Sequence, residues 1–148
     1  HILHIFLLNY RYSIIIFNSK NMDKTSNALN WFEVPAVDIA RAKKFYEAIF
    51  AAELSDMPEM MGMKMAAFPA DWNTGKVSGA LAQSPMHKPS EVGTVIYLNA
   101  NPDIQAVLDR VEAAGGKVAM PRTSLGPNGF MAFIIDTEGN KMGLHAQN

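Results

Sequence analysis

The sequence predicts an α+β fold in which two βαβββ modules form a cupped mixed sheet around a cavity. Three observations predict this fold. A β-rich alternating segment followed by an amphipathic helix occurs near residues 29–51 and again near 94–116. Further strand-like segments follow each helix, and a polar linker separates the two halves. Because one such module leaves an open sheet with an apolar face, each module needs the other to cover it.

The length and composition of the chain suit one globular domain. Its 148 residues are enough for two small modules that share a core, and 49% apolar with 18% charged residues argues against disorder. The net charge of -1, without clustered basic residues, predicts neither a nucleic-acid nor a membrane partner. The absence of cysteine excludes a disulfide and a thiolate nucleophile, so any metal would have to bind to His and carboxylate groups. We expect a cytoplasmic protein.

The first 21 residues differ in character from the rest. The segment HILHIFLLNYRYSIIIFNSK is apolar, but it lacks the ordered regions of a secretory signal and is short for a bilayer span. We expect residues 1–21 to be non-native upstream sequence that precedes a natural start at Met22. An added strand or helix that covers a sheet or a dimer surface is the alternative. The domain then spans 22–148, with its modules at about 27–85 and 92–146.

The first half begins with a strand and a helix. The segment LNWFEVPAV predicts a strand whose Trp31 and Glu33 share one side. Asp38 is placed to cap a helix over residues 39–51, in which apolar residues recur at helical spacing. MKMAAFPA, the turn DWNTGK and VSGALAQ predict the later strands and their connection. We interpret the five methionines between residues 57 and 65 as core filling, with an apolar pocket lining as the alternative.

The second half repeats this order after the linker SPMHKPSEVG. TVIYLNA predicts a strand, Asp103 a helix cap, and IQAVLDRVEAAGG a helix that ends at Gly115 and Gly116. KVAMP, FMAFIID and KMGLHA predict the later strands. His87, in the linker, is assigned no role.

These segments resemble the vicinal oxygen chelate superfamily, which comprises glyoxalases, bleomycin-resistance proteins and extradiol dioxygenases. The resemblance rests on FEVPAVDIARAKKFYEAIF in the first half and on DIQAVLDRVEAAGGKVAMP and IDTEGNKMGLH in the second, and it covers about residues 27–146. It implies paired modules that enclose a cavity. Enzymes of the superfamily hold a divalent metal there, which binds two neighbouring substrate oxygens and polarises them.

The resemblance also implies where metal ligands would stand. Aligned on these motifs, three of the four usual ligand places fall on Trp31, Ile96 and Gly143, none of which offers a donor atom. Because a catalytic metal normally has three protein ligands, we predict no cofactor. A divalent metal is the alternative. The side chains left to hold one are Glu33, Gln83 and His145.

Two polar residues are expected on the cavity side of the first and last strands. Strand alternation directs Glu33 to the side of Trp31 and His145 to the side of Gly143. As expected neighbours, Glu33 and His145 would form a polar anchor, an acid–base pair or a structural ion pair. Arg122 could meet an anionic ligand from a loop, or lie exposed on the surface. The predicted substrate-binding residues are Trp31, Glu33, Met65, Ile96, Leu98, Arg122, Gly143 and His145.

Two functions are consistent with this pattern. The first is a homodimeric protein that binds a small molecule in its cavity without a catalytic metal, in the manner of the bleomycin-resistance branch. Aromatic side chains such as Tyr97 would stack on a planar ligand, or belong to the core. The second is a lyase, isomerase or dioxygenase that recruits a metal through a non-standard ligand set. The sequence leaves open whether the protein is an enzyme.

Overall fold

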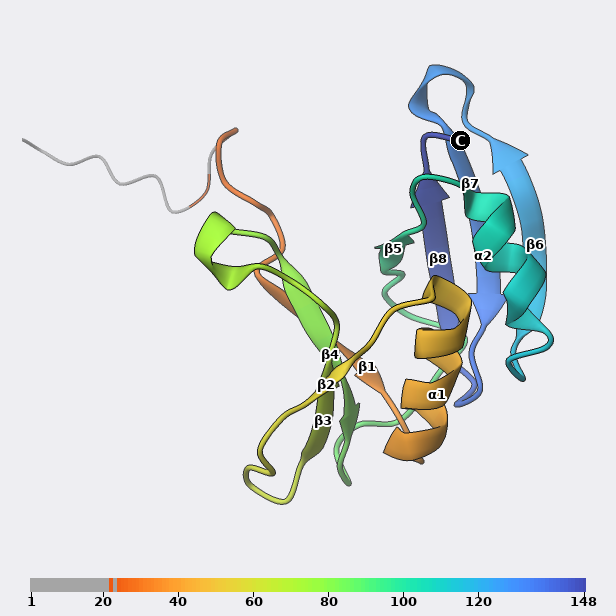
Figure 1. Ribbon diagram of the computed structural model, residues 1–148. Coiled ribbons are helices and arrows are strands. Elements are labelled where there is room, and N and C mark those ends of the chain that lie inside the picture. The colour runs from red at the N-terminus through yellow and green to blue at the C-terminus, as the bar shows by residue number, and fades with distance from the viewer. Residues whose placement is uncertain (1–21, 23) are drawn as a thin grey trace, which may run out of the picture.

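Over Met22 and residues 24–148, the computed structural model contains two four-stranded sheets and two α-helices (Figure 1). The predicted α+β class is confirmed, although the strands form two separate sheets rather than one continuous sheet. The expectation for residues 1–21 lies outside the described residues. No helix in the described part of the chain is long and apolar enough to cross a membrane.

The elements follow the same order in both halves. The first sheet has the spatial order β1 (Trp31–Pro35), β4 (Ser78–Gln83), β3 (Lys64–Ala67) and β2 (Ser55–Asp56). The second has the order β5 (Tyr97–Asn99), β8 (Lys141–Ala146), β7 (Phe130–Ile135) and β6 (Lys117–Ser124). In each sheet the first strand pairs in parallel with the last, and the other pairs are antiparallel. A helix connects the first two strands of each sheet in the sequence.

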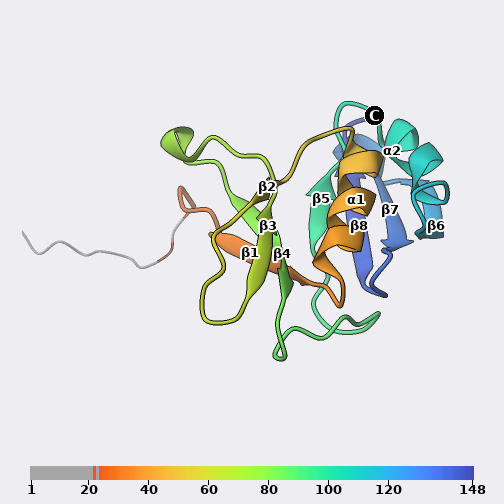
Figure 2. The same ribbon diagram turned by 60° about the horizontal axis from the view of Figure 1, so that its bottom comes forward.

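Helix α1 (Ile39–Phe50) forms where the sequence predicts it. The Asp38 carboxylate accepts hydrogen bonds from the backbone N–H groups of Ala40 and Arg41, which the first turn would otherwise leave unpaired. The apolar residues of the helix lie on one face, where they are buried against the sheets and α2 (Ile104–Val111). Figure 2 shows the two helices near each other, with the second sheet behind them.

Helix α2 is shorter than predicted. Asp103 caps it by accepting the Gln105 N–H, as expected, but the α-helix ends at Val111 and residues 112–115 form turns. Gly115 has a φ of +97°, a conformation that favours glycine, and its N–H bonds to the Glu112 carbonyl. The glycine signal therefore marks the end of the turns rather than the end of the helix.

The two faces of the first sheet bury different clusters. Val34, Ala66 and Leu81 point towards the main core, which they share with the helices and the second sheet. On the opposite face, Met65 packs with small side chains in a separate cluster. That cluster contains Ala67, Ala80 and Ala82, with Trp31 and Met63 against it.

The core-filling interpretation of the methionines is wrong for most of them. Met65 is 8% exposed, whereas Met57, Met60 and Met61 are 37%, 60% and 96% exposed. These three methionines lie in the loop between β2 and β3, outside the strands of the sheet, and the loop does not bury them in the core. Residue spacing cannot distinguish such a loop from an irregular core segment, because methionine suits both.

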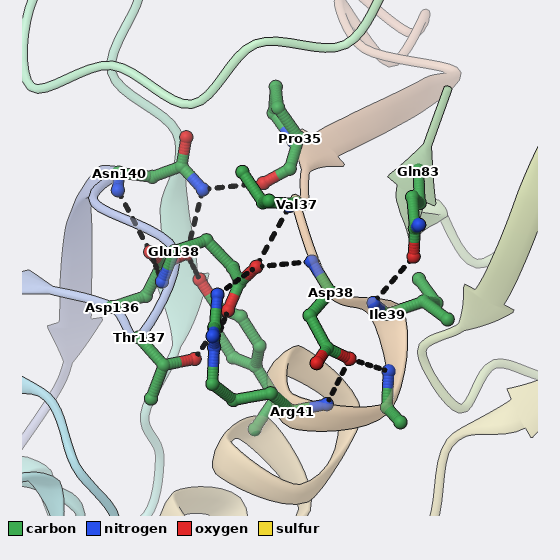
Figure 3. A network of polar contacts seen from close by, with 12 residues as sticks. Pro35, Val37, Asp38, Ile39, Arg41, Gln83, Asp136, Thr137, Glu138 and Asn140 are labelled. Atoms are coloured by element: carbon green, nitrogen blue, oxygen red, sulfur yellow. Dashed lines mark hydrogen bonds and ion pairs between the residues drawn. The ribbon is translucent and has the colours of Figure 1, made fainter. Parts of the chain in front are cut away.

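A network of polar groups joins the two halves (Figure 3). Glu138, in the turn between β7 and β8, reaches the start of α1, where its carboxylate accepts the N–H groups of Val37 and Asp38 at 2.8 and 2.7 Å. The guanidinium of Arg41 binds the same carboxylate through two nitrogens, at 2.7 and 3.1 Å. The Glu138 side chain has no exposed surface. A charged group from the second half therefore completes the helix start of the first half.

The same turn carries two buried polar residues, Asp136 and Asn140. Asp136 accepts the Tyr46 hydroxyl at 2.7 Å, and burial raises the pKa of Tyr46 well above its usual value, which keeps that hydroxyl a donor. The Asn140 amide donates to Asp136 and to the Pro35 carbonyl. Every buried side-chain nitrogen and oxygen among the described residues has a hydrogen-bond partner. The halves are thus connected by satisfied polar groups as well as by apolar contact.

The Glu138 network predicts a specific acid sensitivity. Burial opposes ionisation of Glu138, but the hydrogen bonds from Arg41, Asp38, Thr137 and Val37 outweigh it and hold the pKa below the ordinary 4.5. A lowered folded-state pKa contributes stability above the unfolded pKa, and this contribution is lost as the pH falls through the folded value. Glu138→Gln should therefore be less stable than the unmodified protein near neutral pH, by about 2 kcal/mol.

Urea unfolding measured at a series of pH values checks this expectation. The difference between the two proteins should shrink as the pH falls below 4.5. Glu59→Gln, which changes an exposed carboxylate, is the control and should differ little from the unmodified protein at any pH. A Glu138→Gln difference that stays constant with pH would contradict the ionic role of Glu138.

Candidate functional site

The face of the first sheet opposite α1 carries Trp31 and Glu33, as strand alternation predicts. Both belong to β1 and are two residues apart, and the indole Nε1–H of Trp31 donates to Glu33 Oε1 at 3.2 Å. Next to them, the alanines of β3 and β4 form a floor of small side chains. Trp72 lies in the short 3-10 turn Trp72–Thr74 and packs on Trp31 with ring centroids 5.8 Å apart. This face therefore combines apolar surface with one carboxylate.

The partner of Glu33 is His87 rather than the predicted His145. His87 Nε2 lies 2.7 Å from Glu33 Oε2, and His87 Nδ1 lies 2.7 Å from the Ser84 hydroxyl. Ser84 Oγ already accepts the Met86 N–H, so its own hydrogen is free to be donated to Nδ1. Because an ionised carboxylate has no hydrogen to give, His87 Nε2–H is the donor to Glu33. The pKa of Glu33 is lowered, chiefly by the hydrogen bond from His87.

His145 lies in the second sheet with another partner. Its Nε2 is 2.8 Å from the Asn128 carbonyl, in the loop that precedes β7. The predicted pairing of Glu33 with His145 is therefore wrong, because the separate sheets give each residue its own neighbours. The sequence offered one local sign of the His87 contact, the Ser84–Pro85 pair. It begins a four-residue turn in which the His87 N–H donates to the Ser84 carbonyl. The contact itself depends on the path of the linker.

Gly143 lies under an aromatic ring. It pairs with Tyr97 across β5 and β8, and a Cβ atom at residue 143 would stand 2.6 Å from the Tyr97 ring. On the other side of Gly143, Phe133 of β7 lies opposite, and the Tyr97 and Phe133 centroids are 5.8 Å apart. The glycine is needed because the ring occupies the space of a side chain. Tyr97, which is 48% exposed, is thus presented on this face.

Ile96 and Leu98 are directed away from that face. Leu98 belongs to the main core and Ile96 packs against it, whereas Tyr97 and Asn99 are exposed. We expected these two side chains on the cavity face of β5, whereas they lie on the core face. An error of one residue in register has this effect. Both still reach the wall of a cavity described next, Ile96 from the residue before β5 and Leu98 from within it.

A cavity of about 700 Å³ opens between the first sheet and β5. Its wall is largely apolar and aromatic, and it is built from both halves of the chain. The side chains that define it are Phe32, Phe50, Phe68, Ile96, Tyr97 and Leu98. A second, more open hollow of about 500 Å³ adjoins it, and there Leu98 and Tyr97 meet His145, Leu125 and Met131. Of the predicted binding residues, Ile96, Leu98 and His145 therefore line hollows.

Arg122 does not lie in a loop. It belongs to β6, the outer strand of the second sheet, and its guanidinium carbon stands 3.3 Å from the centroid of the Phe130 ring. Because Phe130 packs against the main core, this stacking places Arg122 on the helix side of the sheet edge. The predicted role above the cavity mouth is not supported by this position.

The three side chains considered as metal ligands have separate partners. Gln83 Oε1 accepts the Ile39 N–H at 2.8 Å and so completes the start of α1, while Glu33 is bound to His87 and His145 to Asn128. In this arrangement they do not form one donor set. Among the described residues, no group of three or more His, Cys, Asp or Glu side chains is placed to hold a metal ion.

Comparison with known proteins identifies relatives of the chain. A family model described as Glyoxalase/Bleomycin resistance protein/Dioxygenase superfamily matches residues 28–144. CFP32 of Mycobacterium tuberculosis, named as a candidate glyoxylase, is 34% identical over 121 residues, which are 80% of this chain and 45% of CFP32. This chain thus spans about half the length of that relative. A glyoxylase-like domain-containing protein of Didymella fabae is 30% identical over 76% of this chain and 88% of its own length.

Solved structures share the fold. A glyoxalase/bleomycin resistance protein from Albidiferax ferrireducens aligns with 82% of this chain and 100% of its own, with a TM-score of 0.61 and 16% identity. TnmS3, an antibiotic binding protein from Streptomyces sp. CB03234, aligns with 85% of this chain and 100% of its own, with a TM-score of 0.56 and 22% identity. At these identities the likeness concerns the fold alone. Together with the family match, it shows that the chain belongs to the Glyoxalase/Bleomycin resistance protein/Dioxygenase superfamily.

Proposed function

We propose that the protein binds a small, largely apolar and planar molecule in the cavity between the first sheet and β5. The observation that carries this proposal is the cavity itself, whose volume of about 700 Å³ suits a small ligand. Phenylalanines from three separate segments, Phe32, Phe50 and Phe68, contribute to its wall. Burial of apolar ligand surface against these rings supplies the main favourable free energy of binding.

Polar groups at the cavity would orient the ligand. Asn99 and Asn101 lie in its wall, and Asn99 Oδ1 accepts two hydrogen bonds from Asn101. The Asn99 amide nitrogen donates no hydrogen bond to another described residue, so it can donate to a ligand carbonyl. TnmS3, which shares the fold, is an antibiotic binding protein, and this supports a binding role for the same scaffold. A homodimeric state and a cytoplasmic location remain predictions.

Filling the cavity tests the proposal. Ala52 lines the cavity just beyond α1, so Ala52→Phe should occupy ligand space without removing a core side chain. Thermal-shift measurements with small aromatic and dicarbonyl compounds should identify ligands that stabilise the unmodified protein by mass action. Ala52→Phe should lose these shifts. Ala113→Phe, at an exposed site after α2, is the matched control and should retain them. Equal shifts in both variants would place the ligand elsewhere.

The alternative is a metal-dependent lyase, isomerase or dioxygenase with a non-standard ligand set. The separate partners of Glu33, Gln83 and His145 support the metal-independent proposal. We expect metal analysis of the purified protein to find no stoichiometric Ni, Zn, Mn or Fe after equilibration with each ion. Stoichiometric metal that is lost in Glu33→Ala or His145→Ala would overturn this expectation and favour the alternative.

A further inference from the structure

Both tryptophans of the chain belong to one site on the first sheet. Trp31 and Trp72 are the two tryptophans in the sequence, and their rings meet at 5.8 Å with an interplanar angle of 31°. Trp72 is 57% exposed although it is among the largest apolar side chains, so the pair is not enclosed in the core. Neither residue lines the cavity of the proposed function. The pair therefore forms a separate aromatic surface.

A negative charge lies at the edge of this surface. The Glu33 carboxylate accepts the indole N–H of Trp31, and its side chain is 32% exposed. Two donors, Trp31 and His87, hold the carboxylate in position, and its pKa is lowered, chiefly by the hydrogen bond from His87. Ser84 Oγ lies 2.7 Å from the other ring nitrogen of His87 and so fixes the imidazole beside the carboxylate.

We propose that the Trp31–Trp72 pair and Glu33 form a binding site for an organic cation, of the quaternary or substituted ammonium class. The negative face of an indole ring attracts a cation, and a nearby carboxylate adds direct electrostatic attraction. An alkylated ammonium also buries its methyl groups on the rings and needs no donor from the protein. Asp71 and Lys76, on the loop that carries Trp72, have opposite charges and add no net charge to it.

The arrangement suits an organic cation better than a metal ion. Glu33 is the carboxylate bound at the Trp31 indole, and the large neighbouring groups are aromatic and thioether surfaces rather than oxygen donors. Divalent ions such as Ca²⁺ and Mg²⁺ require several oxygen ligands, whereas an alkylated ammonium is satisfied by aromatic faces and one charge. The chemistry of the surface therefore selects a bulky, weakly hydrated cation.

Choline and its uncharged carbon analogue, 3,3-dimethylbutan-1-ol, provide a direct test. In the nitrogen-15 correlation spectrum of the full chain, the two indole N–H signals report on Trp31 and Trp72 alone. We expect choline to shift both signals saturably and the neutral analogue to shift them much less. Glu33→Gln should weaken choline binding about tenfold or more, whereas Glu91→Gln, which removes an exposed carboxylate elsewhere, should not.

The aromatic contribution is tested at the exposed Trp72, where substitution spares the core. Trp72→Leu should weaken choline binding, measured by the remaining Trp31 signal, and Trp72→Phe should restore part of it. Equal responses to choline and its neutral analogue would overturn the proposal, as would a Glu33→Gln protein that binds choline as well as the Glu91→Gln protein. Absence of any saturable shift would also overturn it. The Ala52→Phe experiment tests ligand binding in the cavity separately. A negative result with choline would therefore overturn the cation site and leave the proposed function unaffected.

Discussion

The fold depends on a buried polar connection between its halves. The turn between β7 and β8 supplies Asp136, Glu138 and Asn140, and each of them satisfies groups outside its own turn, at Tyr46, at the start of α1 and at the Pro35 carbonyl. Apolar contacts alone would allow the halves to slide, because dispersion and the hydrophobic effect have little directional preference. Hydrogen bonds fix one arrangement, since a shift would leave buried groups without partners. The position of β1 and of the cavity wall next to it follows from this connection.

The sequence predicted those features that depend on local chemistry. Asp38 and Asp103 cap their helices, and alternation placed Trp31 and Glu33 on one face and Val34 on the other. These outcomes depend on neighbours within a few residues, which a sequence displays directly. The division into two sheets and the pairing of Glu33 with His87 depend on how distant segments are placed. No local pattern contains that information.

The sequence-based prediction of the β5 register was wrong because the two halves differ in length by one residue before the helix cap. Val34 and Leu98 both reach the main core, and Ala36 and Ala100 follow them as buried residues. The second half, however, has one more residue between its alanine and its helix cap. Counting back from Asp103 by the spacing of the first half therefore gave a position that points into the core. Tyr97, the residue between Ile96 and Leu98, points to the opposite face of the sheet.

The close approach of the Tyr97 ring to Gly143 couples these two positions through volume. Any side chain at residue 143 and an aromatic ring in this orientation at residue 97 exclude each other sterically. A lineage could not acquire a carboxylate at residue 143 by one substitution while the ring kept its place. A relative with an acidic side chain at residue 143 would need a smaller side chain at residue 97, acquired earlier or at the same time. The two residues are therefore expected to change together in evolution.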